Sequence, residues 1–230
     1  GNVTFQDDTG QDPFTGSLDI DTGQTIKLNA NYPTGATTNV IMGNNALTGG
    51  SISGGLNTVI GSAAGNNATL TSGSRTTIVG ANSGSGAGAS NTIVGADVLQ
   101  NNVFGQNTVV GARAVTNGQN VQRCVAMGYE AGFSSDATND NTIIGFQAHK
   151  TNTTGVENVV IGSKAMNLGD GGDHNIAIGT EALENGGNQI QNIAIGYRAL
   201  NNMSGGFQNV AIGDEAMNSS VNAWGSVAIG

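Results

Sequence analysis

A short apolar segment that ends in glycine recurs along most of this chain at a nearly constant interval. Two examples are NTIIG at 141–145 and NVAIG at 209–213. From Gly111 onward the terminal glycines are 17 residues apart, and the earlier intervals range from 15 to 19 residues. A fixed period of this kind predicts stacked repeats that bury a shared core. The twelve glycines are Gly43, Gly61, Gly80, Gly95, Gly111, Gly128, Gly145, Gly162, Gly179, Gly196, Gly213 and Gly230.

Each repeat predicts a short β-strand followed by a corner and a polar connection. In NTIIG, Thr142 and Ile144 share one face of the strand because side chains alternate along it, and Ile143 points to the other face. Both faces are apolar, so the strand needs a partner on each side. One partner is the coil's own interior, and the other is most simply another chain. We therefore expect an all-β parallel β-solenoid with coils of ~17 residues, assembled as a homotrimer.

Two positions of the repeat are expected to be structural. The glycine after the strand suits a corner with positive φ or a close approach of another backbone. An asparagine four residues earlier would stack from coil to coil and form an amide hydrogen-bond ladder, which we favour over a ligand-binding role. These asparagines are Asn39, Asn57, Asn91, Asn107, Asn141, Asn158, Asn175, Asn192 and Asn209.

A further position, two residues after the glycine, alternates in charge along the chain except at Gln147 and its neighbour. If coils stack one strand spacing apart, each acid there lies beside a base. Exposed pairs of this kind contribute only about 0–1 kcal/mol each. The residues in order are Asp97, Arg113, Glu130, Gln147, Lys164, Glu181, Arg198 and Glu215.

Composition excludes several other classes of protein. Glycine contributes 38 of 230 residues, which makes long helices improbable. The net charge of −9 and the lack of a basic run argue against nucleic-acid binding. No apolar run is long enough to insert in a membrane. One cysteine, Cys124, excludes an intrachain disulfide. The sequence begins at Gly1 without methionine, so we expect a processed or cut portion of a longer protein.

The first 38 residues lack the repeat and are expected to form a separate unit. Residues 1–38 contain both prolines, Pro13 and Pro33, together with short alternating segments that predict strands. We interpret them as a cap or connector that covers the open end of the solenoid at 39–230. The acidic segment QDDTGQDP could instead bind calcium, but it lacks the ligand spacing of an EF-hand loop.

No constellation of residues indicates catalysis, a cofactor or a metal. The sequence shows no Ser, Cys or carboxylate constellation that would make His149 or His174 a catalytic base. Three copies of His149 near a trimer axis could bind an ion, although a packed or solvent-facing histidine is the simpler interpretation. Cys124 stands in a ladder position and is interpreted as a small buried residue. The residues that we assign to a contact surface for a glycan or protein receptor, although packing could also explain them, are Tyr129, Phe146, Tyr197, Phe207 and Trp224.

The repeats resemble a known family. NVAIGDEAM at 209–217, NIAIGYRAL at 192–200, NIAIGTEAL at 175–183 and the closing SVAIG are similar to the head repeats of trimeric autotransporter adhesins (YadA-like). The resemblance covers 39–230 and implies a left-handed parallel β-roll, three chains packed side by side, and attachment to host surfaces. The same repeat style resembles segments of phage and giant-virus tail fibres, so both a bacterial cell surface and a virion remain open.

Three functions are compatible with the repeats. The first is an extracellular adhesive or receptor-binding head, and the second is a purely structural spacer shaft with its binding tip elsewhere. The third, a polysaccharide depolymerase, would need two carboxylates facing one groove. We expect the first of these, without enzymatic activity.

Overall fold

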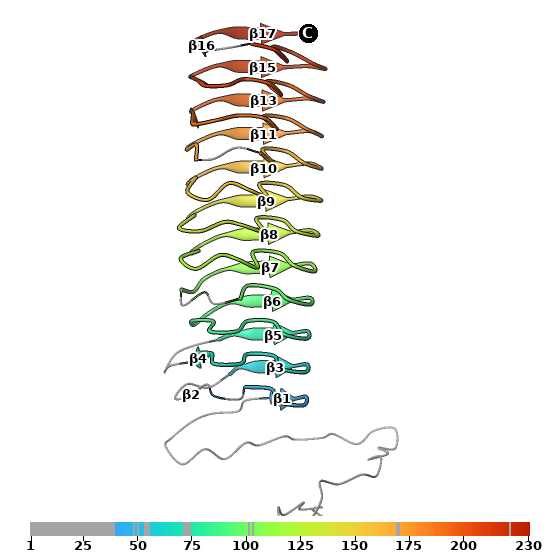
Figure 1. The fold of residues 1–230 in the computed structure, drawn as a ribbon, viewed down its shortest axis with the longest axis vertical. Helices are drawn as coiled ribbons and strands as arrows, with labels where there is room; N and C mark the ends of the chain where they lie inside the picture. The colour runs from blue at the N-terminus through green and yellow to red at the C-terminus, as the bar shows by residue number, and fades with distance from the viewer. Residues whose placement is uncertain are drawn as a thin grey trace, which may run out of the picture.

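The computed structural model describes residues 40–47, 49, 51–52, 56–70, 75–100, 102, 104–168, 171–220 and 222–230. The predicted cap at 1–38 and the ladder residue Asn39 lie outside this part of the chain. All regular elements within it are β-strands, and they stack one above another along a single axis (Figure 1). The predicted all-β parallel solenoid with coils of about 17 residues is confirmed.

One parallel sheet of twelve strands runs the length of the rod. Adjacent strands pair position for position, so that Val159 lies opposite Ile176 and Ile161 opposite Ile178. The strands are β1 (Val40–Met42), β3 (Thr58–Ile60), β5 (Thr77–Val79), β6 (Thr92–Val94), β7 (Thr108–Val110), β8 (Val125–Met127), β9 (Thr142–Ile144), β10 (Val159–Ile161), β11 (Ile176–Ile178), β13 (Ile193–Ile195), β15 (Val210–Ile212) and β17 (Val227–Ile229).

Two smaller parallel sheets form in the connections between these strands. One joins β12 (Gln189–Ile190), β14 (Gly206–Phe207) and β16 (Ala223–Trp224), and the other joins β2 (Ser51–Ile52) and β4 (Thr69–Leu70). They pair connections of neighbouring coils on another side of the rod (Figure 1). The connections therefore stack in register as well as the main strands.

The central residue of the main strands points into the coil. Ile143 and Ala177 are buried, whereas the residues on either side of them are partly exposed. Two positions of each repeat occupy the coil interior. The first is this central strand residue, and the second is the residue four positions after the corner glycine. A coil with isoleucine at the first position can have glycine at the second, as in Ile78 and Gly84, and a coil with Ala177 has Leu183. Adjacent coils also share this space, because a Cβ on Gly132 would lie 3.2 Å from Ile143 of the next coil, as close packing of the interior requires.

The corner glycines adopt a backbone conformation that other residues avoid. Those of the twelve repeats have φ between +130° and +143°. A Cβ on Gly95 would lie 2.7 Å from the carbonyl oxygen of Gly111, and a Cβ on Gly145 would overlap the carbonyl oxygen of Gly162 even more closely. Both reasons that favour glycine, a positive φ and a close backbone approach, therefore apply at the same residue.

The turns also contain residues other than glycine with positive φ. Two and four residues after the corner, Glu130, Gln147 and His149 have φ between +51° and +53°. The N–H of Gln147 donates to the carbonyl of Tyr129 in the preceding coil at 2.9 Å. Hydrogen bonds between coils thus hold ordinary residues in a left-handed conformation that costs about 1 kcal/mol or more each.

We predict that Gly145→Ala destabilises the fold by about 2 kcal/mol or more, because alanine is strained at φ +140° and its Cβ meets the Gly162 backbone. Gly187→Ala is the matched control, because the corresponding Cβ would meet nothing within 4 Å. Guanidinium unfolding followed by circular dichroism measures both variants. Equal stability of the two would contradict this account of the corner.

Candidate contact surface

The asparagines four residues before the corners are buried and connect one coil to the next. The Oδ1 of Asn158 accepts a hydrogen bond from the backbone N–H of Asn175 at 2.8 Å, and the Oδ1 of Asn175 accepts one from Asn192 at 2.9 Å. The Nδ2 of Asn158 donates to the Gly172 carbonyl at 2.8 Å. Each amide therefore satisfies a buried donor and a buried acceptor, as buried polar groups require. The same backbone-to-Oδ1 bond links Asn57 to Thr76, Asn91 to Asn107, Asn107 to Cys124, Asn141 to Asn158, Asn192 to Asn209 and Asn209 to Ser226.

Cys124 occupies a ladder position with a thiol instead of an amide. Its side chain is buried, and the sulfur lies 3.4 Å from the carbonyl oxygens of Gln122 and Thr138. Burial raises the pKa of the Cys124 thiol to about 11. A thiol that stays protonated at neutral pH is a poor nucleophile, so the structure gives Cys124 a packing role.

We predict that Cys124→Asn stabilises the protein by about 1 kcal/mol. The new Oδ1 can accept the N–H of Asn141, and the new Nδ2 lies where the sulfur now approaches the Thr138 carbonyl. Cys124→Ala, which removes the thiol without adding an amide, is the control and should be less stable than the original chain. Thermal unfolding ranks the three proteins, and an asparagine variant below the alanine variant would rule out the ladder explanation.

Among the described residues, no group of three or more His, Cys, Asp or Glu side chains could hold a metal ion, so neither histidine belongs to such a group. His149 is fully buried in the coil interior, where its Nδ1 lies 3.5 Å from Ser135 Oγ. Burial lowers the pKa of His149 to about 4, so the ring is neutral at physiological pH. Because His149 points into its own coil, it is a packed residue and not a group presented to other chains. His174 is exposed and lies 3.0 Å from Glu157.

The position with alternating charge contains one strongly connected carboxylate. Glu130 is buried and lies 2.5 Å from Arg113 and 2.6 Å from Lys150, and it accepts a hydrogen bond from Gln147 at 3.0 Å. The Lys150 ammonium and the other donors hold the pKa of Glu130 below its usual range, against the opposing effect of burial. Phe133 lies beneath both cations, 4.7 Å from the Arg113 guanidinium carbon.

The predicted alternation of charge is confirmed only in part. Arg198 lies 2.6 Å from Glu181 and 3.9 Å from Glu215, as the order of residues predicts. Within the described ranges, however, neither Asp97 nor Lys164 forms an ion pair. Side chains at this position are long and partly exposed, so stacking of the backbone does not by itself bring every charge into contact.

The five aromatic residues assigned to a contact surface lie at least partly in solvent. Tyr129 and Phe146 come from adjacent coils and stack with ring centres 5.7 Å apart and an interplanar angle of 13°. Phe207 and Trp224 form a second pair at 4.6 Å, and Trp224 is 67% exposed. Tyr197 is also exposed and lies beside the Arg198 guanidinium. Four of these five aromatics therefore pair with a ring of a neighbouring coil, and all five still present ring surface to solvent.

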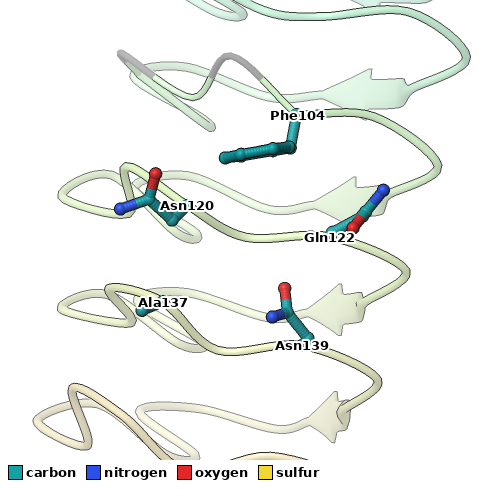
Figure 2. Close-up of a pocket in the computed structure, with 5 residues that line it drawn as sticks. All are labelled: Phe104, Asn120, Gln122, Ala137 and Asn139. Atoms are coloured by element: carbon teal, nitrogen blue, oxygen red, sulfur yellow. The ribbon is translucent and has the colours of Figure 1, made fainter.

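Sequence reasoning missed a hollow of about 140 Å³ on the side of the rod. It spans three successive coils, and Figure 2 shows the ring of Phe104 extending over the gap between Asn120 and Gln122. The remaining lining residues are Ala137 and Asn139, one coil further along.

The repeat spacing contains the signal that could have located this hollow. The coil that carries Phe104 runs from Gly95 to Gly111 and is one residue shorter than the coils that follow. We attribute the hollow to this change in coil length, because the shorter connection cannot superpose residue for residue on its longer neighbour.

Comparison with known proteins does not identify a relative. No protein-family model matches the chain, no curated protein matches it, and no solved structure matches it. Among the residues that the structure describes, no helix is long and apolar enough to cross a membrane. The surface of the rod is therefore the feature from which a function can be proposed.

Proposed function

We propose that this chain is the head of an extracellular attachment fibre, built as a homotrimer of left-handed β-rolls on a bacterial cell or a virion tail fibre. The observation that carries the proposal is the outer face of the twelve-stranded sheet. Its side chains are threonine, valine, isoleucine or methionine in every strand, without a charge. At about 4.8 Å per strand, this face is roughly 50 Å long.

A continuous uncharged face of this length favours burial against another molecule. Val94, Met127 and Ile212 are 37%, 41% and 36% exposed on it. Further copies of the same chain are the simplest partners, because cyclic symmetry keeps every chain pointing in the same direction along a fibre. The resemblance of NIAIGYRAL and related repeats to trimeric adhesin heads supports three copies.

We predict that the chain sediments as a trimer and that Ile178→Asp shifts it to monomer, because a carboxylate on the outer face would lose its water on assembly. Ile178 lies in β11 on that face. Thr180→Asp, beyond the corner and exposed, should remain trimeric. Analytical ultracentrifugation measures both variants, and a monomeric original chain would refute the assembly.

The exposed aromatic pairs support recognition by the head itself. Aromatic side chains supply large contact area with little loss of side-chain entropy, which suits them to binding surfaces. Tyr129 with Phe146, and Phe207 with Trp224, each offer two rings in fixed relative positions. A spacer shaft has no need of such pairs, so they favour a binding head over the spacer.

We predict that the 230-residue chain attaches to host cells or glycan-coated beads and that replacing both Phe207 and Trp224 by alanine weakens attachment by about tenfold. Leu168→Ala is the control, since Leu168 is an exposed apolar residue away from both aromatic pairs. Flow cytometry with labelled protein measures attachment. Absence of binding by the intact chain would favour the spacer function instead.

A further inference from the structure

The hollow beneath Phe104 combines an apolar platform with uncharged hydrogen-bonding groups. The Phe104 ring is 41% exposed, and the other lining side chains are three amides and an alanine. Among the described residues, no charged side chain lines it. The chemistry of this hollow therefore differs from that of the Glu130 cluster, where cations and a carboxylate lie beside the stacked rings of Tyr129 and Phe146.

Two of the three charged residues that adjoin the hollow in sequence neutralise each other. Arg123 directly follows Gln122 in the sequence, and Asp140 directly follows Asn139. The two form a bidentate salt bridge with N–O distances of 2.6 and 2.7 Å. Hydrogen bonding between the two lowers the pKa of Asp140 and raises that of Arg123, so both remain ionised and paired. The third, Asp136, directly precedes Ala137 and has no cationic partner among the described residues, so an anionic ligand would find no unpaired cation there.

The side-chain amides that line the hollow can form further hydrogen bonds. Asn139 Oδ1 is buried and accepts no hydrogen bond, and the Gln122 side chain makes none within the described ranges. Asn120 Nδ2 donates weakly to Asp136 at 3.4 Å, which leaves its oxygen available. The terminal amide torsion of asparagine is broad, so Asn139 can turn either its oxygen or its NH₂ group toward a ligand.

From this combination we infer that the hollow binds a neutral sugar ring of a glycan, with the apolar face of the sugar against Phe104 and its hydroxyls on Asn120, Gln122 and Asn139. Hydroxyls both donate and accept hydrogen bonds, as the three amides require. A purely apolar ligand would bury amides without partners, and such sites discriminate strongly against ligands that lack the hydroxyl. The volume of about 140 Å³ suits one ring and not a drug-sized ligand.

The inference rests on the proposed attachment function for its biological role, but its test is separate. The 230-residue chain is screened on an array of neutral and acidic oligosaccharides, and the best neutral binder is then titrated by calorimetry. We expect neutral sugars to be preferred. Phe104→Ala and Asn139→Asp should each weaken binding by about tenfold or more, because they remove the platform and an uncharged NH₂ donor respectively.

Leu168→Ala is the matched control, since Leu168 is an apolar residue that is 55% exposed and lies outside the three coils that form the hollow. It should leave the calorimetric affinity unchanged, and circular dichroism verifies that all three variants fold. A preference for acidic sugars, no binding of any neutral sugar, or an unchanged affinity of Phe104→Ala overturns the inference.

The two proposals fail in different ways. If the chain attaches to cells and the Phe104 and Asn139 variants attach equally well without binding neutral sugars, the sugar site is wrong and the attachment function stands. If calorimetry shows Phe104-dependent sugar binding while no cell or bead is bound, the sugar site stands and the attachment function is wrong.

Discussion

The contact between successive corner glycines is the constraint on which the rest of the structure depends. At Gly145 the backbone approaches the Gly162 carbonyl so closely that no side chain fits between them. The sheet hydrogen bonding also continues through the corner, where the Gly145 N–H donates to the Met127 carbonyl at 2.8 Å. Together these contacts fix one register for every coil, because a shift of one residue would place a side chain where only glycine is tolerated.

A fixed register converts the sequence period into columns of side chains in space. One column is the amide ladder, in which Asn158, Asn175 and Asn192 each satisfy groups of the next coil. Another is the interior pair of positions, where side chains of neighbouring coils share the space, since a Cβ on Gly84 would lie 3.2 Å from Ile93 of the next coil. Stability is thereby distributed along the rod, and individual coils can differ in length and surface.

The surface of the rod separates into sides of different chemistry. The outer face of the main sheet is uncharged from β1 to β17, and it is the face that we propose to be buried against other copies of the chain. Elsewhere the turns carry paired aromatic rings and the buried Glu130 with its two cations. The hollow at Phe104 adds an uncharged recess on a side that the main sheet does not occupy. Assembly and recognition can therefore use different parts of the same coil.

The sequence by itself determined the period, the strands, the corner glycines and the positions of the ladder asparagines. Each of these depends on a backbone requirement that one residue type meets best, so the requirement can be read from residue identity alone. Only the tertiary structure decided which side chains meet between coils. Glu130 contacts Arg113 and Lys150, whereas Lys164 forms no ion pair with any other described residue, and His149 lies inside its coil. The hollow at Phe104 likewise arises where coils of unequal length stack, and such contacts depend on side-chain direction and loop length, which the period does not specify.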